Sequence, residues 1–299
     1  MDRIDLFRVF VRVVDCASFT RAAETLRLPR SSVSAAVQEL EGRIGARLLA
    51  RTTRRVALTH DGAAFYDRCQ RLIADVEEVE GLFRHDAPPA GRLRADIPGR
   101  IGRLVVVPAL PEFLGLYPGL TVELGVTDRA VDLVEEGVDC AIRVGPLSDS
   151  TLIARPIGEL SLVNVASPAY LARFGAPRSP AELAGHQAVR YASPSTGRVD
   201  DWEWIEGGVA HRLDLPGPVT VNSAEAYIAA AVAGLGLIQI PAYDVREPLA
   251  SGALVEVMPD HRAAPLPMTL LYPSRRHLSR RLHVFMDWIV PLLARETRA

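Results

Sequence analysis

The stretch SFTRAAETLRLPRSSVSAAVQELEGRIGARLLARTTRRVALTHDG, residues 18–62, predicts two short helices joined by a tight turn and followed by a basic hairpin. Ser18 is expected to cap the first helix, because its hydroxyl can accept from backbone N–H groups that a helix start leaves open. Pro29 is expected to open the second helix, where its missing N–H costs nothing. The small side chains of Ala22 and Ala23 allow the two helices to cross closely, so we expect a compact helix-turn-helix.

The second helix of this stretch has two different faces. One is apolar at helical spacing and is expected to hold the helix to the domain; it consists of Val33, Val37, Leu40 and Ile44. The other suits a DNA major groove, where Ser and Gln bind base edges and Arg binds guanine or phosphate. Taken alone, the helix is better explained as an ordinary amphipathic helix with a solvated face, because motif matches give many false positives. The predicted DNA contacts are Arg30, Ser31, Ser32, Ser34, Ala35 and Gln38.

The charge of the neighbouring sequence favours the DNA interpretation. Residues 27–58 hold seven arginines and two acidic residues, a net charge of +5 on a chain whose total is −2. A basic segment on an otherwise acidic chain is typical of nucleic-acid binding. Residues 48–59 predict two short strands around a turn, and the tip of this hairpin is expected to grip phosphates. The residues concerned are Arg51, Thr52, Thr53, Arg54 and Arg55.

The segments SFTRAAETL, SVSAAVQELE and LLARTTRRVALTHDG resemble the winged helix-turn-helix of LysR-type transcriptional regulators. Later segments, VDLVEEGVDCAIRVG, ASPAYLARFGAP, AGLGLIQIPAY and LYPSRRHL, resemble the effector-binding part of the same regulators. Two positions differ: the family usually has a capping Ser where Pro29 stands and often a long polar residue where Ala35 stands. The resemblance implies a sequence-specific DNA-binding transcription regulator controlled by a small-molecule effector.

Length and composition fit this organisation. A chain of 299 residues suits two or three domains. We expect a winged helix-turn-helix domain at 1–59, a linker helix at 60–84, a hinge at 85–91 and an effector-binding domain at 92–299. An additional helix at residues 4–15 is expected to pack behind the helix-turn-helix. The hinge, HDAPPAG, is stiffened by two prolines and freed at its end by a glycine.

The linker helix carries a heptad seam. Its apolar side chains recur at alternating spacings of four and three residues, which indicates a partner helix. A single amphipathic helix lying on its own domain is the alternative, because few heptads are covered. In the LysR family this helix dimerises, and paired recognition helices then bind a palindromic DNA site; the resemblance also implies a homotetramer. The predicted dimerisation residues are Phe65, Cys69, Leu72, Val76, Val79 and Phe83.

Beyond the hinge, strand and helix patterns alternate, which predicts an α/β fold with a parallel sheet and crossover helices. The expected strands are 93–97, 120–126, 138–144, 160–166, 188–192, 211–221, 237–240, 254–257 and 268–272. The expected helices are 101–116, 128–136, 168–174, 180–184, 224–233 and 277–293. The resemblance implies two doubly wound subdomains around a cleft, as in periplasmic solute-binding proteins. Their expected extents are 92–162 with 266–299, and 163–265.

A ligand of doubly wound sheets binds beyond the carboxyl ends of the strands. Pro98 and Gly99 precede one helix, and Ser223 precedes another; free N–H groups at such helix starts suit an anion. We therefore expect a small organic effector, an anion rather than a cation. The predicted contacts are Ile97, Pro98, Gly99, Arg100, Thr127, Asp128, Arg143, Val144, Gly145, Asn222 and Ser223.

Two of these contacts have a structural alternative. Arg143 can bind a carboxylate of the effector, or it can form an ion pair with Asp96 or Asp128. Asn222 can contact the ligand or cap the following helix. The sequence leaves both alternatives open.

Other classes of function find no support in the sequence. It contains no nucleophile elbow, zinc-protease motif, CxxC or phosphate loop, so we expect no enzyme, metal or cofactor. The three scattered cysteines fit thiols of a reducing cytoplasm. No apolar run resembles a signal peptide or a membrane span, so a cytoplasmic location is expected. A two-lobed solute-binding protein and a ligand-free architectural DNA-binding protein are the alternatives.

Overall fold

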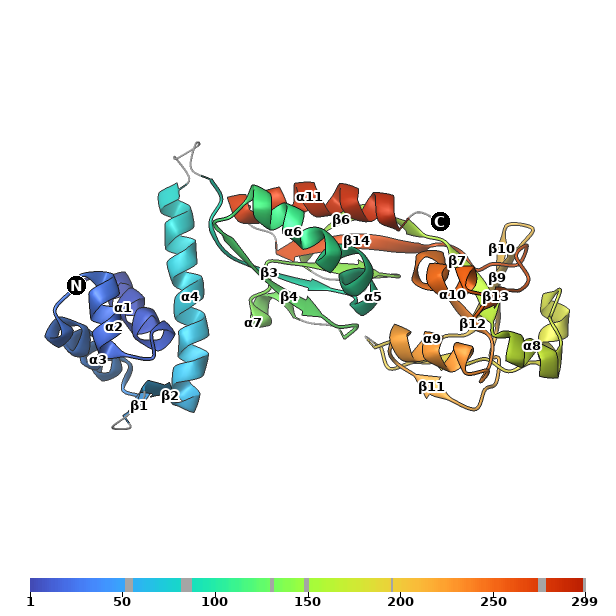
Figure 1. Cartoon of the computed structure of the whole chain (residues 1–299), viewed down its shortest axis with the longest axis horizontal. Helices are drawn as coiled ribbons and strands as arrows, with labels where there is room; N and C mark the ends of the chain where they lie inside the picture. Colours follow the sequence, from blue (N-terminus) through green and yellow to red (C-terminus); the bar gives the residue numbers. More distant parts are fainter. Residues whose placement is uncertain are drawn as a thin grey trace. The chain divides into compact units, whose positions relative to one another are not determined.

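The computed structural model describes residues 1–51, 56–81, 88–129, 132–147, 151–194, 196–273 and 278–297. The chain forms two compact units, Met1–Ala87 and Pro88–Ala299, which are described separately (Figure 1). The first unit is mainly helical. The second unit contains the mixed α/β part of the chain.

Three helices build the first unit: α1 (Arg3–Asp15), α2 (Phe19–Leu26) and α3 (Arg30–Ile44). Oγ of Ser18 accepts from the backbone N–H of Arg21 at 3.3 Å, so the predicted cap is confirmed. Pro29 occupies the N-cap of α3, one residue before the expected position. Ala22 and Ala23 are buried where α2 meets its neighbours, which small side chains permit.

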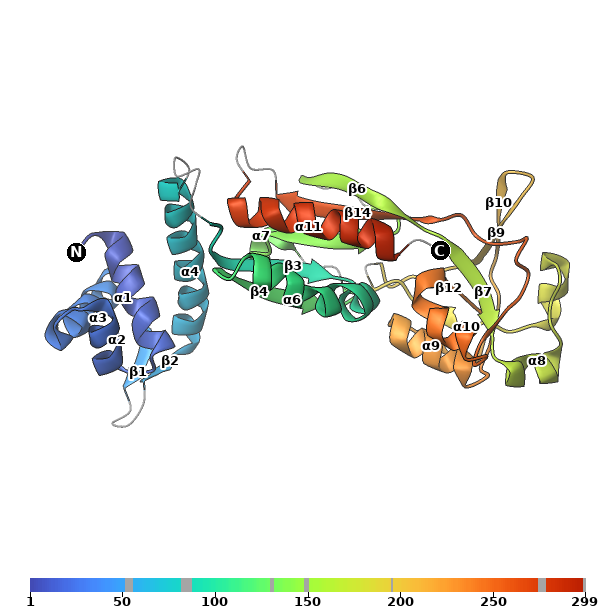
Figure 2. The ribbon, with the colours of Figure 1, turned by 45° about the horizontal axis from the view of Figure 1, so that its top comes forward.

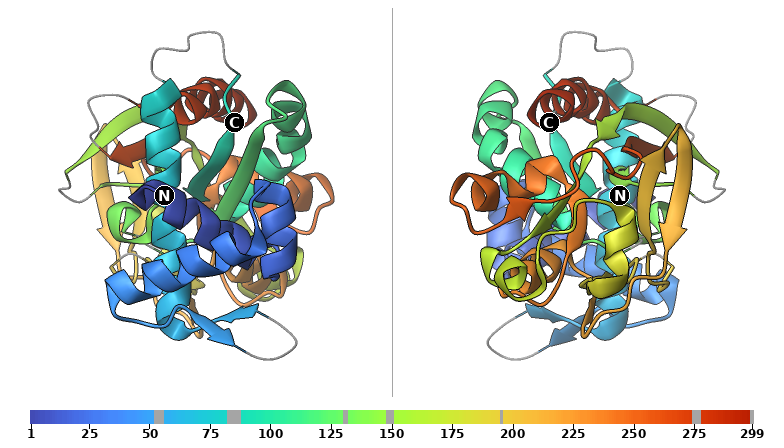
Figure 3. Two further views of the ribbon diagram at one scale, coloured as in Figure 1. Left: turned by 90° about the vertical axis from the view of Figure 1, so that its left-hand side faces the viewer. Right: turned by 90° about the vertical axis from the view of Figure 1, so that its right-hand side faces the viewer.

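A short antiparallel hairpin and a long helix complete this unit. The hairpin pairs β1 (Leu49–Arg51) with β2 (Val56–Leu58), and α4 (His60–Gly81) follows it directly. Gly62 lies so close to the backbone carbonyl of Leu48 that an added Cβ would stand 1.9 Å from the oxygen, so only glycine fits there. α1 lies across α4, as Figure 3 shows. The predicted helical unit is therefore confirmed, with its hairpin turn outside the described residues.

The second unit is organised around a five-stranded sheet of order β4-β3-β5-β14-β6. The first three of these run parallel, whereas β14 and β6 are antiparallel to their neighbours, so the sheet is mixed and not wholly parallel. The strands are β3 (Gly91–Ile97), β4 (Leu120–Val126), β5 (Cys140–Val144), β6 (Leu152–Leu160) and β14 (Leu266–Pro273).

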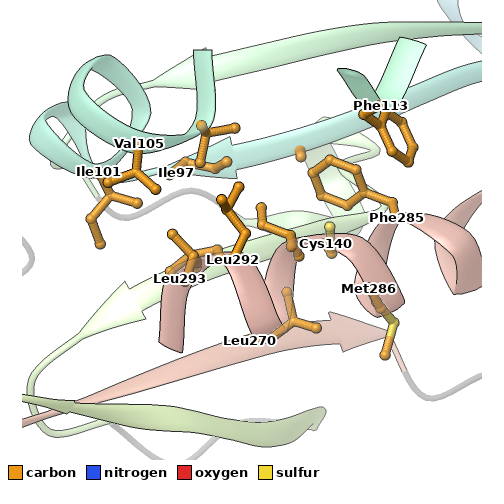
Figure 4. Packing of buried hydrophobic residues seen from close by; sticks show 14 of the residues in the cluster. Ile97, Ile101, Val105, Phe113, Cys140, Leu270, Phe285, Met286, Leu292 and Leu293 are labelled. Carbon is orange, nitrogen blue, oxygen red and sulfur yellow. The ribbon is translucent and has the colours of Figure 1, made fainter. Parts of the chain in front are cut away.

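Helices cover both faces of this sheet (Figure 1), and Figure 4 shows the packing on the first face. On one face, Phe113 and Phe285 meet edge to face with ring centroids 5.6 Å apart. On the other, Leu133 packs against Ala141 and Leu271. The covering helices are α5 (Gly99–Ile101), the π-helical turn η1 (Gly102–Val106), α6 (Val107–Leu116) and α11 (Arg280–Glu296) on the first face, and α7 (Leu133–Glu136) on the second.

A second half of this unit is built on the three-stranded sheet β12-β7-β13, visible at the right of Figure 2. Its strands are β7 (Leu162–Ala166), β12 (Ile238–Pro241) and β13 (Val255–Glu256). Two small pairs, β8 (Arg190–Tyr191) with β11 (Thr220–Val221) and β9 (Trp202–Glu206) with β10 (Val209–Leu213), are attached to it. Its helical parts are α8 (Pro168–Phe174), the 3-10 turns η2 (Pro180–Gly185) and η3 (Ala242–Val245), α9 (Ala224–Val232) and α10 (Arg246–Ala250).

Several predicted elements are wrong in extent. The expected strand at 160–166 breaks at Ser161, where the chain passes from the five-stranded to the three-stranded sheet. The expected strand at 211–221 is two separate strands, interrupted by Pro216 and Pro218. The expected helix at 128–136 is reduced in the described residues to α7, which Asp132 caps. Strands β6 and β9 were not predicted.

Candidate functional site

The predicted DNA-binding face of α3 is free of the core. Val33, Val37 and Leu40 are buried, so the apolar stripe holds the helix as expected, although Ile44 at its end is 40% exposed. Arg30, Ser31, Ala35 and Gln38 are exposed, and Ser32 and Ser34 are half-buried. Among the described residues, neither Arg30 nor Gln38 has a side-chain partner within the protein. These polar groups are therefore available to a ligand.

Glu41 fixes the hairpin against the end of α3. Its Oε1 accepts from the backbone N–H groups of Leu48 at 2.8 Å and Leu49 at 3.1 Å. The strand that leads to the hairpin tip therefore starts from a fixed place beside the exposed helix. The four predicted phosphate contacts Thr52, Thr53, Arg54 and Arg55, and the side chain of Arg51, lie outside the described residues.

The predicted seam on α4 divides into two parts. Phe65 packs against Phe7 and Phe10, with centroids 5.8 and 5.7 Å apart, and Cys69 is fully buried in the same core. At these two positions the helix packs on its own unit, which was the alternative to a partner helix. Leu72 is 46% exposed and Val76 half-buried. The side chain of Val79 and all of Phe83 lie outside the described residues.

A cavity of about 430 Å³ opens at the carboxyl ends of β3, β4 and β11. Loops after parallel strands meet there, so residues far apart in the sequence line one space. Six of the predicted effector contacts line it: Gly99, Arg100, Thr127, Asp128, Asn222 and Ser223. Arg103, Val126, Arg129, Pro194 and Glu225 line it too and were not predicted.

Five of the predicted contacts lie away from this cavity. Ile97 is fully buried in the core of the five-stranded sheet, and the next residue, Pro98, is the N-cap of α5. Arg143 donates from Nη1 to Oδ1 of Asp96 at 2.8 Å, so the structural ion pair is the interpretation that holds. Neither Val144 nor Gly145 reaches the cavity either.

The start of α5 already has an anionic partner. The backbone N–H of Gly99 donates to Oδ1 of Asp128 at 2.9 Å. A carboxylate of the protein therefore stabilises the helix start that we expected to receive an anion. Asn222 precedes the N-cap residue Ser223 of α9, and no side-chain capping bond is recorded there. The structure thus supports neither a capping role for Asn222 nor an exposed anion site at Gly99.

Arg100 is the most extensively bonded side chain at the cavity. Its Nε lies 3.1 Å from Oδ1 of Asp244, and Nη2 donates to the backbone carbonyl of the same residue. Nη1 lies 3.0 Å from both carboxylate oxygens of Glu225. Arg103 adds a contact of 2.7 Å from its Nη1 to Oε1 of Glu225. Two arginines of one half of the unit are thereby paired with two acids of the other half.

The helix that carries both arginines has an irregular turn. The backbone N–H of Val107 bonds the carbonyl of Gly102, five residues back, which defines the π-helical turn. Pro108 follows and has no N–H to continue a regular ladder. Turns of this kind are frequent at functional sites, and this one spans Arg103.

Burial controls the acid–base properties of this cluster. Desolvation raises the pKa of Asp244 to about 6, although the charge of Arg100 opposes the rise. Burial disfavours the charged form of Arg100, but the hydrogen bonds that Arg100 donates to Glu225 and the charge of Asp244 outweigh this effect and raise the pKa of Arg100. For Glu225, hydrogen bonds from Arg103 and Arg100 overcome a partial desolvation and lower the pKa. Glu225 is therefore fully ionised at neutral pH.

A second cavity, of about 500 Å³, lies between η2 and the β9–β10 hairpin. Trp204, Leu213 and Leu215 contribute to its walls. It is larger, but it does not lie at the carboxyl ends of the sheet strands where ligands of doubly wound folds bind. The first cavity is therefore the candidate ligand site.

Other kinds of site are not found in the described part of the chain. No group of three or more His, Cys, Asp or Glu side chains is placed to hold a metal ion there. Within the same residues, no helix has the length and apolar character needed to cross a bilayer.

Comparisons with known proteins cover almost the whole chain. The family profile described as "Bacterial regulatory helix-turn-helix protein, lysR family" matches residues 4–63, and that of the "LysR substrate binding domain" matches residues 86–294. YhjC of Escherichia coli (strain K12), named an uncharacterized HTH-type transcriptional regulator, is 45% identical, with 98% of each chain covered. An HTH-type transcriptional repressor of Pseudomonas aeruginosa (strain UCBPP-PA14) is 38% identical, with 98% of this chain and 93% of the repressor covered.

A solved structure supports the same assignment. The LysR-type transcriptional regulator CrgA of Neisseria meningitidis is 32% identical and matches with a TM-score of 0.61. The match covers 97% of this chain and 98% of CrgA. The similarity therefore extends over the winged helix-turn-helix and the α/β part together, and not over a single shared domain.

Proposed function

Because the chain belongs to the LysR family of DNA-binding transcription regulators, we propose that it binds a palindromic promoter site as a homodimer or homotetramer and is controlled by an anionic organic effector. The chain differs from solute-binding proteins because it carries a helix-turn-helix in addition to the two-lobed α/β part. Working on DNA, it would act in the cytoplasm.

The observation that carries the DNA-binding proposal is the exposed polar face of α3. Arg30 and Gln38 stand free of partners among the described residues, while Glu41 fixes the neighbouring hairpin. We propose that α3 enters the major groove with Arg30, Ser31, Ser32, Ser34, Ala35 and Gln38 towards the bases. Arg51, Thr52, Thr53, Arg54 and Arg55 would bind the phosphates alongside.

The effector would occupy the 430 Å³ cavity between the two halves of the second unit. Three arginines line it, Arg100, Arg103 and Arg129, against the two acids Asp128 and Glu225. The side chains of Arg103 and Arg129 are 64% and 63% exposed, so an anion can reach their guanidinium groups. A ligand here would contact both halves, and one that binds a particular arrangement of the halves more tightly would shift the protein towards it.

Dimerisation would use the remaining exposed side of α4. Leu72 presents a large apolar side chain to solvent, and Val76 lies one turn further along. Burying such a side chain against a second copy is favourable. Two recognition helices held in this way would read the two halves of a palindrome.

DNase footprinting on the intergenic DNA upstream of the gene tests the regulatory proposal. We expect one protected region with two-fold related half-sites, and an affinity that falls steeply with added salt because bound arginines release counterions. Equal protection of all sequences would leave only non-specific binding.

A thermal-shift screen of small carboxylates, amines and neutral metabolites tests the proposed effector. Stabilisation only by amines or neutral compounds would contradict an anionic effector.

A further inference from the structure

The ion pairs around Arg100 divide into a buried part and an accessible part. Asp244 is 4% exposed and accepts hydrogen bonds from Nε and Nη2 of the guanidinium. Glu225 is 48% exposed and accepts only from Nη1 of the same group. Arg100 itself is 10% exposed. Asp244 therefore fixes the orientation of Arg100, and this fixed side chain turns one remaining edge, Nη1, towards the cavity.

Glu225 occupies the position where a carboxylate in the cavity would bind. Its two oxygens lie 3.0 Å from Nη1 of Arg100, and one of them also lies 2.7 Å from Nη1 of Arg103. Charge-assisted hydrogen bonds from guanidinium groups to a carboxylate are stronger than neutral ones, so two such groups make a good carboxylate site. Glu225 lines the same cavity as the two arginines, so the protein's own side chain and an incoming anion require the same donors.

The ion pairs of Glu225 can also be broken and replaced by those of a ligand. Ion pairs at half-exposed positions are weak, because water screens the charges and the side chains lose freedom. Arg103 is 64% exposed, so both it and Glu225 can move without uncovering the core. Asp244, by contrast, is 4% exposed, so a ligand that replaced it would disrupt the packing around it.

We propose that Glu225 is a built-in substitute for the effector: an organic carboxylate enters by displacing the Glu225 side chain from Arg100 and Arg103. This inference rests on the proposed function and names the effector's chemical class, a small carboxylate. Exchange would remove the ion pairs that join α9 to α5 and η1, while the Arg100–Asp244 pair remains. Ligand binding would therefore loosen the charged connection through Glu225 between the halves, which is a means of regulation.

Chemical rescue with propionate tests the proposal, because propionate carries the carboxylate and the adjoining methylene that Glu225→Ala removes. In the full chain at constant ionic strength, saturating propionate should raise the Tm of Glu225→Ala by about 3 °C. The wild type should shift by less than about 1 °C, since Glu225 competes. Glu247→Ala is the matched control: this exposed acid also lies in the first turn of a helix of the same half, away from the cavity.

Two further measurements sharpen this test. Propionamide, which is neutral, should leave the Tm of Glu225→Ala unchanged, and the double variant Glu225→Ala/Arg103→Ala should lose most of the propionate response. Equal propionate shifts in wild type, Glu225→Ala and Glu247→Ala would overturn the proposal, as would a response that persists without Arg103. If Glu225→Ala does not fold, Glu225→Ser removes the same carboxylate and enters the same comparison.

Failure of this proposal is distinguishable from failure of the proposed function. If larger carboxylates stabilise the wild type but propionate does not act selectively on Glu225→Ala, the anionic effector stands and Glu225 is a fixed structural pair. If propionate rescues Glu225→Ala but no carboxylate stabilises the wild type, the carboxylate position exists and the anionic effector is wrong.

Discussion

Oδ1 of Asp244 lies 3.1 Å from Nε of Arg100, and this pair joins the two halves of the second unit where both side chains are almost completely buried. Removing one partner of a buried ion pair leaves the other without compensation. The pair is therefore sensitive to substitutions that the exposed Glu225 tolerates.

Asp244→Ala should lower the free energy of unfolding of the second unit by about 3 kcal/mol, because Nε of Arg100 loses its acceptor in a buried site. Asp244→Asn keeps an oxygen at this place and should cost much less. Glu225→Gln, at a half-exposed pair, should cost less than about 1 kcal/mol. All three tryptophans, Trp202, Trp204 and Trp288, belong to the second unit, so urea unfolding followed by tryptophan fluorescence reports this unit. Equal losses for Asp244→Ala and Glu225→Gln would contradict this prediction.

The raised pKa of Asp244, about 6, predicts a pH dependence of stability. Between the ordinary pKa of 3.8 and about 6, the folded protein holds a proton on Asp244 that the unfolded chain has lost. The free energy of unfolding contributed by this group therefore falls as pH rises through this window, by about 3 kcal/mol in all. Urea unfolding at pH 4.5 to 7 should show this slope in the wild type and a flatter one in Asp244→Asn. Identical slopes would show that Asp244 does not take up the proton.

Arg143 should act in stability and not in effector binding. Arg143→Met retains much of the side-chain volume but leaves Asp96, which is 4% exposed, without its cation. We expect a loss of about 3 kcal/mol in the same urea assay. Any carboxylate that stabilises the wild type should raise the Tm of Arg143→Met by the same amount. A selective loss of the carboxylate response would place Arg143 in the effector site after all.

The exposed part of α4 should control the oligomeric state. Val76→Asp or Leu72→Asp would bury an unpaired charge between two copies, which costs several kcal/mol, so sedimentation velocity should show smaller species. Ala63→Asp places the same charge at an exposed position about half a turn around the helix from Leu72 and should leave the oligomer unchanged. An unaltered oligomer in both seam variants would mean that this side of α4 forms no interface.

Local rules explain what the sequence could predict. The cap at Ser18 depends on residues three apart, and the strands β3 and β4 are marked by their own apolar composition. Once these strands are placed, the loops after them must meet, which is why Gly99, Thr127 and Asp128 line one cavity. The same rule fails for Arg143. The end of its strand does not reach the cavity, and its guanidinium pairs with Asp96 on the adjacent strand.

The residues that sequence reasoning missed depend on long-range packing or on overlooked signals. Asp244 is 144 positions from Arg100, and no periodic pattern connects them. Phe65 and Cys69 follow the heptad of a partner helix, yet the same spacing also fits a helix packed on its own unit. The β9–β10 hairpin did have a local signal: Gly207 and Gly208 both adopt positive φ, 56° and 80°, as a two-residue hairpin turn requires.

Competition binding can test the claim that α3 reads DNA sequence. A labelled fragment of the upstream intergenic DNA is titrated with wild type, Ser34→Glu and Ala63→Glu, each against unlabelled random DNA. We predict that wild type and Ala63→Glu prefer the intergenic fragment by about a thousandfold. Ser34→Glu should fall to the affinity for random DNA, because it places a negative charge in the groove. A wild type that binds both DNAs equally, or a Ser34→Glu that retains the preference, would contradict the claim.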